Sequence, residues 1–179
     1  DSLKSINQES LLKLNLLNKD NIRLREILSL QQSSNNDNIS AAVISRKTGG
    51  WWRQIILNKG SKDGVEIGST VTGPGGLLGR VNNTSLFTAS VTLITSPESK
   101  LGVWVDRSQI NGLLVGSGDD HPSLILYSKE ADIKVGDFVS SSPASSLLPP
   151  NIPIGIVQSI DETSQSKKMA KISLFANPQ

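Results

Sequence analysis

The segment VEIGSTV, residues 65–71, returns in outline further along the chain as IKVGDFV, residues 133–139. Both copies read apolar, charged, apolar, glycine, and both place a valine three residues after the glycine. A second matching pair follows downstream, LGRV at 78–81 and IGIV at 154–157. Two copies of one hairpin plan predict two related β-modules in tandem.

The glycines and valines of the repeat carry the prediction. Gly68 and Gly136 can adopt the positive φ needed to turn into a following strand, and we expect Val71 and Val139 to begin that strand facing inward. In each copy, the first two apolar residues are expected to end one pleated face. Gly79 lies inside a strand pattern, as does its counterpart in 154–157, and glycine there marks a bulge or a tight barrel corner.

From residue 39 onward the sequence consists of short apolar stretches separated by Gly, Pro, Asn, Asp and Ser. This pattern predicts short β-strands joined by turns. Successive strands often start about ten residues apart, which favours sandwich or barrel modules over βαβ units. The expected strands are 54–57, 77–81, 90–94, 101–105, 124–127, 154–157 and 170–174. The predicted fold class is therefore an all-β core of two small tandem barrels.

Residues 1–32 contain no glycine or proline and are rich in good helix formers. A heptad places leucine at five and asparagine at two of nine seam positions, with Ser10 and Gln31 at the other two. Asparagine at an a position fixes the register of a two-stranded coil. The predicted dimerisation residues are Leu3, Leu14, Leu17, Asn21, Leu24 and Leu28. An amphipathic helix that packs on its own domain is the alternative. Residues 33–38 form a polar linker.

Composition excludes several classes of function. The chain has 179 residues, a net charge of +2 and 4% aromatic residues, and no run of Lys or Arg, which argues against a nucleic-acid partner. It has no cysteine, so no disulfide, thiolate metal site or cysteine nucleophile is expected. No stretch approaches 18 consecutive apolar residues. The chain begins at Asp1 and its sole methionine is Met169, so we expect a mature or shortened form, and a preceding membrane helix stays open.

The residues available for chemistry do not form a catalytic or metal-binding pattern. His121 is the only histidine, and no second histidine or G-x-S-x-G elbow accompanies it. The segment TGPGGLLG, residues 72–79, lacks the spacing of a phosphate loop and is expected to be a turn between two strands. We therefore predict no enzyme activity, no metal and no cofactor.

Large apolar side chains outside the expected strand interiors are candidates for partner contact. Adjacent tryptophans in a strand point to opposite faces, and a tryptophan between two inward valines points away from them. The candidates are Trp51, Trp52, Trp104, Leu147 and Leu148. Two alternatives stay open. The tryptophans could cap barrel ends, and the loop 140–155 could pack over a barrel mouth.

Taken in order, the Leu-rich helix, WWRQIILNKGSKDGVEIGSTV, GPGGLLGRV, NGLLVGSG and KVGDFVSSSPASSLLPPNIPIGIV resemble the bacterial MreC family of rod-shape proteins. The resemblance covers the whole chain. It implies two six-stranded β-barrels, like those of trypsin-like proteases without the triad, after an N-terminal coiled coil. It divides the chain into a coil (1–32), a linker (33–38), a first barrel (39–95) and a second barrel (96–179). Whether part of 155–179 completes the first barrel is left open.

The same resemblance implies a function. A family member is a non-catalytic scaffold of the cell-wall elongation machinery, on the periplasmic side of the inner membrane and anchored by a single helix ahead of the coil. It controls rod shape by self-association, through the coil and in a possible higher assembly, and by docking peptidoglycan synthases. The implied partners are a second copy of the chain, the elongation-specific penicillin-binding protein, RodA, MreD and the MreB system.

The family motif maps onto residues that shape turns and corners. The matching positions are Gly60, Asp63, Gly64, Gly68, Gly79, Arg80, Val81, Gly112, Gly116, Gly136, Asp137, Val139, Pro149, Pro150, Pro153 and Gly155. The chain departs from the pattern at Ser142 and Asn151, where family members commonly have glycine. Asparagine tolerates the left-handed conformation, so Asn151 can stand in for glycine.

A second resemblance supplies the alternative function. IKVGDFVSS resembles a turn of the lipoyl-like domains of periplasmic adaptors in efflux complexes, which also pair coiled coils with β-modules. Such adaptors insert a helical hairpin between two halves of a lipoyl domain, whereas the helical segment here is single and N-terminal.

Overall fold

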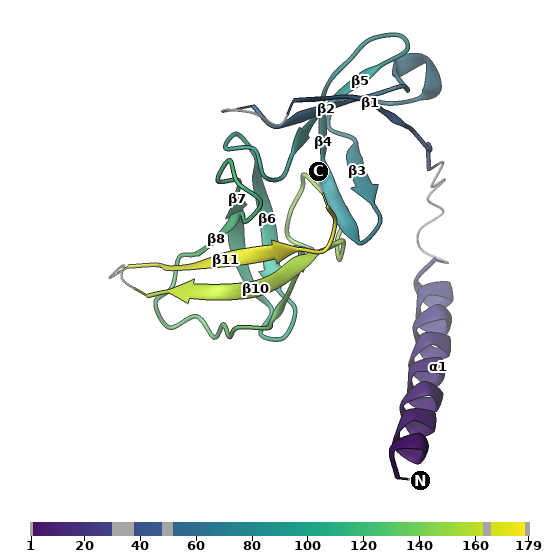
Figure 1. Cartoon of the computed structure of the whole chain (residues 1–179), viewed down its shortest axis with the longest axis vertical. Helices are drawn as coiled ribbons and strands as arrows, with labels where there is room; N and C mark the ends of the chain where they lie inside the picture. Colours follow the sequence, from purple (N-terminus) through teal and green to yellow (C-terminus); the bar gives the residue numbers. More distant parts are fainter. Residues whose placement is uncertain (1, 30–37, 48–51, 163–165, 178–179) are drawn as a thin grey trace. The chain divides into compact units, whose positions relative to one another are not determined.

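The computed structural model describes residues 2–29, 38–47, 52–162 and 166–177 (Figure 1). The chain forms two units, Asp1–Asn38 and Ile39–Gln179, which are considered separately. In the first unit, the predicted helix is present as α1 (Ser2–Ser29). Leu14 and Leu17, on the predicted seam, are exposed in it, whereas the side chains of the other four seam residues lie outside the description. Pairing through this seam remains a prediction.

The first half of the second unit is an antiparallel sheet of five strands, called sheet A. It begins and ends at open edges, β1 and β3. Its order is β1 (Val43–Lys47), β2 (Gln54–Leu57), β5 (Ala89–Leu93), β4 (Gly76–Thr84) and β3 (Thr70–Gly73).

The second half is a closed six-stranded barrel in which every neighbouring pair is antiparallel. Its order is β10 (Pro153–Asp161), β11 (Lys168–Leu174), β8 (Ser123–Leu126), β7 (Ile110–Val115), β6 (Lys100–Val105) and β9 (Phe138–Ser141). The two C-terminal strands therefore complete this barrel and not sheet A.

The prediction of two six-stranded barrels is confirmed for one module only. Sheet A is not closed within the described residues, because β1 and β3 each pair on one side. All five residues of β1 are exposed, so this strand brings no inward face with which to close a barrel. The sequence pattern missed β1 for the same reason. It also missed β7, because Gly112 interrupts the apolar run of this strand. In the structure Gly112 lies against the side chains of Leu124 and Leu126, which leave no room for a Cβ.

The repeated turn is confirmed in both modules. Gly68 has φ +90° and Gly136 has φ +92°. Gly68 N–H donates to the carbonyl of Val81 at 2.8 Å, and Gly136 N–H donates to that of Val157 at 2.9 Å. The return bond is also shared, since Val81 N–H binds Ser69 O and Val157 N–H binds Asp137 O, each at 2.9 Å. The turn that leads into the hairpin therefore has the same backbone conformation and the same hydrogen bonds in both modules.

One detail of the repeat prediction is wrong. The first two apolar residues of each copy lie in irregular backbone and a turn, and not at the end of a pleated face. In the first copy Val65 is buried while Ile67 is 67% exposed, and in the second Ile133 is buried while Val135 is 64% exposed. Alternation predicts a shared face only in extended backbone, and a turn breaks the two-residue period.

The segment 72–79 is the predicted turn between two strands, and it also joins sheet A to the barrel. Figure 1 shows β4 reaching the end of the barrel where β10 and β11 lie. A Cβ at Gly75 would lie 2.5 Å from the carbonyl oxygen of Phe175, and one at Gly76 would clash with that of Pro153. Only glycine allows the two backbones to approach so closely.

Apolar side chains and an ion pair complete this joint. Leu77 of β4 and Ile94, just beyond β5, are fully buried in the core of the barrel. The guanidinium of Arg53, ahead of β2, lies 2.8 Å from the carboxylate of Asp120 in the β7–β8 loop. Sheet A therefore contributes Leu77 and Ile94 to the barrel core, in addition to having a smaller core of its own.

The loop 142–152 is held by buried hydroxyls. Ser141 Oγ donates to Pro149 O at 2.6 Å and accepts from Ile152 N–H at 2.8 Å. Ser142 Oγ bonds the side chain of Asn111 and accepts from the N–H of Ala144. Ser142 is thus accommodated as a hydrogen-bonding residue at the position where the resemblance led us to expect glycine. Asn151 has φ +60°, so it adopts the left-handed conformation that we expected.

Candidate docking surface

The predicted contact residues do not gather into one surface. Trp51 lies outside the described residues. Trp52 is 56% exposed but precedes β2, so it is not in a strand as the alternation prediction required. Trp104 lies on the outer face of β6, between the fully buried Val103 and Val105, as predicted, and is half-buried.

The two leucines of the loop 142–152 lie in different environments. Leu148 is 5% exposed and belongs to the barrel core, whereas Leu147 is 46% exposed. The loop therefore packs on the barrel through one leucine and shows the other to solvent. Leu148 is unsuited to a partner contact.

An exposed apolar cluster that we did not predict lies on the outer wall of the barrel. The rings of Phe138 and Phe175 are 5.8 Å apart between centroids. Phe138 is 54% exposed and Phe175 37%. Ile156 of β10 pairs in register with Phe138, so the two side chains share a face. We call Phe138, Ile156 and Phe175 the aromatic patch.

Sequence alternation contains the signal for part of this patch. Val139 was expected to face inward, which places Phe138 on the outside of the same strand. Phe175 could not have been assigned, because it lies beyond the end of β11 and comes close to Phe138 only through the closure of the barrel.

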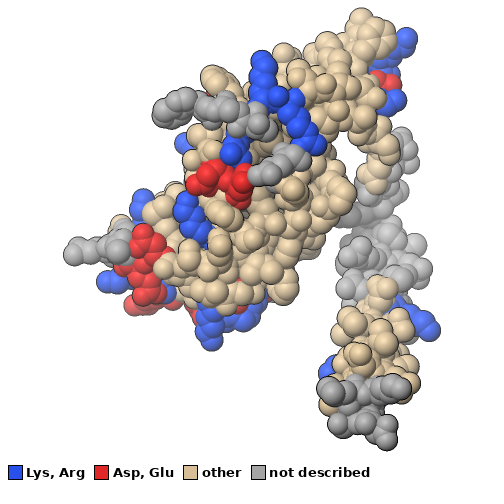
Figure 2. All heavy atoms as spheres, viewed as in Figure 1, with Lys and Arg blue, Asp and Glu red and all other residues tan. Residues whose placement is uncertain are grey.

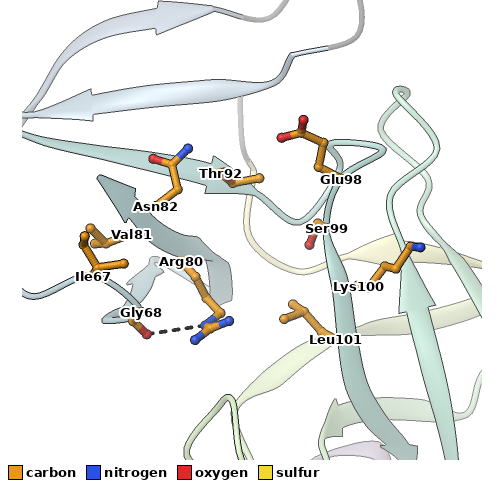
Figure 3. A pocket seen from close by; sticks show the side chains of 10 residues that line it. All are labelled: Ile67, Gly68, Arg80, Val81, Asn82, Thr92, Glu98, Ser99, Lys100 and Leu101. Carbon is orange, nitrogen blue, oxygen red and sulfur yellow. Dashed lines mark hydrogen bonds between the residues drawn. The ribbon is translucent and has the colours of Figure 1, made fainter. Parts of the chain in front are cut away.

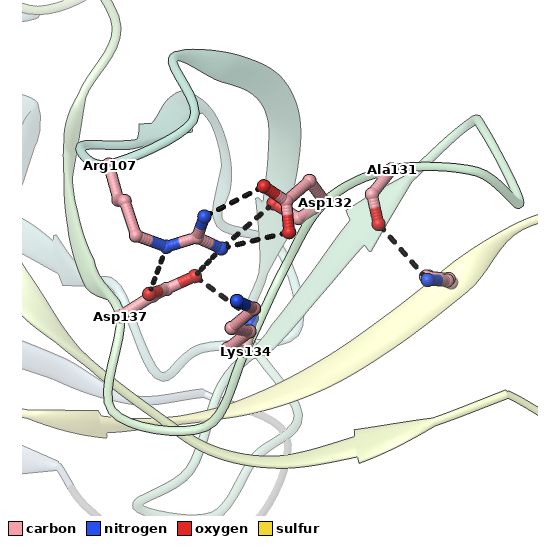
Figure 4. Close-up of polar contacts among 6 residues, drawn as sticks. Arg107, Ala131, Asp132, Lys134 and Asp137 are labelled. Atoms are coloured by element: carbon pink, nitrogen blue, oxygen red, sulfur yellow. Dashed lines mark hydrogen bonds and ion pairs between the residues drawn. The ribbon is translucent and has the colours of Figure 1, made fainter.

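The motif aspartate of the second module is part of a polar clip at the base of β9 (Figure 4). Arg107 donates to both oxygens of Asp137 at 2.8 and 2.9 Å, and to Asp132 at 2.7 and 3.1 Å. Asp137 also accepts from Lys134 N–H at 2.9 Å, as Ser69 does from Glu66 N–H in the first module. Asp137 therefore closes the turn of the second module as Ser69 closes that of the first, and it also forms an ion pair with Arg107.

The clip predicts a pH dependence of stability. The hydrogen bond from Arg107 lowers the pKa of Asp137, and the Lys134 N–H lowers it further against the opposing effect of burial. Because the folded pKa lies below the unfolded one, this stabilisation is fully present above the unfolded value of about 3.9. It is lost as the pH falls through the folded value.

Asp137→Ser isolates this effect, because serine keeps the turn bond as Ser69 does but removes the charge. We expect the unfolding free energy of the variant to fall less than that of the native chain between pH 6 and pH 3, by urea titration at each pH. Equal acid sensitivity of the two proteins would contradict the assignment.

A cleft of about 330 Å³ separates sheet A from β6 (Figure 3). Its lining includes Ile67, Arg80, Glu98, Lys100 and Leu101. Arg80 points its guanidinium into the cleft and donates from Nε to Gly68 O at 3.4 Å. The charged side chains that line the cleft are Arg80, Lys100 and Glu98. The cleft therefore carries a net positive charge and would attract a negatively charged group more readily than a positively charged one.

The remaining motif residues hold backbone in place. Each of three glycines lies against a neighbouring strand or turn, so that a Cβ would meet backbone atoms: Gly79 against Thr92, Gly116 against Ser96 and Gly155 against Ser173. Asp63 accepts from Gly60 N–H at 3.1 Å, and Gly64 has φ +92°. These contacts support a role of the motif in the fold, which remains our prediction for the motif as a whole.

The loop that contains His121 is stabilised as a turn. Asp119 Oδ1 accepts from the His121 N–H at 2.9 Å and from Ser117 Oγ at 2.6 Å. Within the described ranges, no group of three His, Cys, Asp or Glu side chains could hold a metal ion. No helix in those ranges is long and apolar enough to cross a bilayer. Figure 2 shows positive and negative side chains interspersed on the face in view, without a continuous basic stripe.

These features define an all-β module in which an open sheet is joined to a closed six-stranded barrel, with apolar side chains exposed on the barrel surface. Residues 43–179 match the family model of the barrel core of the rod shape-determining protein MreC, and the chain belongs to this family. Membership agrees with the prediction that the chain is not an enzyme.

Individual relatives agree. The chain is 33% identical over 151 residues to the cell shape-determining protein MreC of Listeria monocytogenes, which covers 81% of this chain and 51% of the relative. The chain thus spans about half the length of this curated relative. An MreC structure from Listeria monocytogenes superposes with a TM-score of 0.78 at 26% identity, covering 95% of this chain and 86% of that one.

A structure of a complex between penicillin-binding protein PBP2 and MreC from Helicobacter pylori also matches. Its TM-score is 0.62 at 16% identity, covering 78% of this chain and 87% of that one, so it shows the shared fold.

Proposed function

We propose that this chain is the periplasmic part of a non-catalytic scaffold that maintains rod shape by docking cell-wall synthases. The observation that carries the proposal is the match of residues 43–179 to the family of shape-determining proteins, which spans both β-modules. The elongation-specific penicillin-binding protein is the proposed first partner, supported by the complex known for the Helicobacter pylori relative. RodA, MreD and the MreB system are proposed as further members of the same assembly.

The proposal places the anchor ahead of this chain and the dimer contact on α1. The 28 residues of α1 would span roughly 42 Å at 1.5 Å per residue. Exposed Leu14 and Leu17 support pairing along the predicted seam, because a paired coil would remove them from water. We also propose that sheet A is an opened version of the barrel plan, which the shared turn hydrogen bonds support. The efflux-adaptor alternative gains no support, since α1 is the one long helix among the described residues and has no helical partner there to form a hairpin.

The aromatic patch is the proposed synthase contact on the barrel. Exposed aromatic side chains beside apolar neighbours are typical of binding hot spots. Trp52, which is exposed ahead of β2, is proposed as a second contact from our original candidates. Phe138 and Ile156 lie on paired strands of the closed barrel, so their backbone is already ordered before binding.

Biolayer interferometry against the detergent-solubilised, full-length elongation penicillin-binding protein of the same organism tests this proposal. We expect saturable binding that weakens by at least about tenfold in Phe138→Ser, the loss expected of an interface aromatic. Tyr127→Ser is the matched control, because Tyr127 is 72% exposed at the end of β8, outside the patch. Absence of binding by the native chain, with folding verified by circular dichroism, would refute the proposed function.

A further inference from the structure

A second apolar feature lies at the far end of sheet A, where β4 turns into β5. Leu86 and Phe87 occupy this turn and are 64% and 61% exposed. Neither contributes to either hydrophobic core. We call this pair the apolar tip.

The turn under the apolar tip is held from within. Ser85 N–H donates to Thr88 O at 2.8 Å, and Thr88 N–H donates back to Ser85 Oγ at 3.2 Å. The two hydroxyls lie 2.6 Å apart. These bonds close the turn without using Leu86 or Phe87, so both side chains are left to project.

The short helix η1 (Ser61–Asp63) braces the same turn from outside. Ser61 N–H donates to Ser85 O at 2.8 Å and Lys62 N–H donates to Leu86 O at 3.1 Å. Gly60, a residue of the family motif, lies so close that a Cβ would come within 2.6 Å of Thr88 N. The close approach of Gly60 thus fixes the backbone of this turn, while the side chains of Leu86 and Phe87 stay exposed and outside both cores.

The charge around the apolar tip narrows the choice of partner. Lys62 Nζ lies 5.4 Å from the centre of the Phe87 ring. Lys59 lies 3.9 Å from Asp63, so the surroundings carry two lysines and one carboxylate. A complementary socket would be apolar inside with carboxylates at its edge.

A second copy of this chain does not offer such a socket in its described cleft. That cleft has apolar walls at Ile67 and Leu101, but its charges are Arg80, Lys100 and Glu98. Lys62 would approach a surface with its own sign of charge. A membrane surface is also a poor match, because two side chains and one net positive charge give only weak attachment. A rigid apolar pair suits a folded protein pocket, where little entropy is lost on binding.

We propose that the apolar tip is an anchor that seats in an apolar socket edged by carboxylates on the cell-wall synthase. This inference rests on the proposed function and adds a second contact to it, on sheet A and separate in sequence from the aromatic patch. Lys62 steers the approach, and Leu86 and Phe87 fill the socket.

The test uses the full chain and the detergent-solubilised, full-length elongation penicillin-binding protein. Phe87→Ser is expected to weaken binding at least about 30-fold, the level of an interface hot spot, with an unchanged melting temperature because the side chain is exposed. Lys62→Ala is expected to slow association and to reduce its dependence on salt. Tyr127→Ser again serves as the control.

The other outcomes separate the two proposals. Native affinity in Phe87→Ser, with loss in Phe138→Ser, would overturn the anchor and leave the scaffold function intact. No binding by the native chain would refute the scaffold function itself. Sedimentation of the native chain, but not of Phe87→Ser, with vesicles of phosphatidylglycerol and phosphatidylcholine would assign the tip to a membrane surface. Weaker self-association of Phe87→Ser in analytical ultracentrifugation would assign it to a second copy. Either result would overturn the inference.

Discussion

Leu77→Ala is expected to lower the free energy of unfolding by about 3 kcal/mol, the usual loss for a fully buried leucine. Leu77 belongs to β4 of sheet A, yet its side chain is fully buried in the barrel core. The cavity would therefore open at the joint between the two modules. In differential scanning calorimetry we expect sheet A and the barrel to unfold in one transition in the native chain and in two transitions in Leu77→Ala.

Leu57→Ala is the matched control, because Leu57 is buried only in the core of sheet A. It should destabilise sheet A without removing a shared contact. A single, uniformly shifted transition in Leu77→Ala, like that of a variant with an ordinary core cavity, would show that Leu77 does not couple the modules.

Gly76→Ala is expected to cost about 3 kcal/mol at the same joint, from two causes that add. The backbone has φ +154°, which L-residues rarely adopt. The new Cβ would clash with the carbonyl oxygen of Pro153, whose backbone cannot yield as a side chain would. Urea unfolding at neutral pH measures the loss.

Gly136→Ala separates the two causes. Gly136 has φ +92°, but a Cβ there would meet nothing within 4 Å, so only the backbone strain of about 1 kcal/mol applies. Equal losses in the two variants would mean that the close approach of the hairpin to the barrel contributes nothing to stability.

Local chemistry explains what could be predicted from the sequence. The turn at Gly68 and Gly136 needs a left-handed glycine followed by an inward valine, and this requirement appears directly as a repeated phrase. Asn151 follows the same reasoning. The strands with alternating or continuous apolar residues were found, because burial on one or both faces imposes a period.

The features that escaped prediction depend on contacts between distant segments. β1 has no buried face and therefore no pattern to detect. Leu77 looks like an ordinary strand residue of the first module, and only the close approach at Gly76 carries it into the second core. The partner of Phe138 in the aromatic patch comes from beyond β11. Leu148 was predicted as a contact but is buried, because barrel closure leaves a gap that the loop 142–152 fills.

Cell shape measured in the source bacterium tests the central claim most directly. Phe138→Ser and Tyr127→Ser would be introduced separately into the gene at its own locus, with protein levels checked by immunoblot. If the chain is a docking scaffold, Phe138→Ser cells widen and lose their rod shape at native protein levels, whereas Tyr127→Ser cells stay rods. Rods of normal width in Phe138→Ser would contradict the claim that the aromatic patch holds the wall-building machinery.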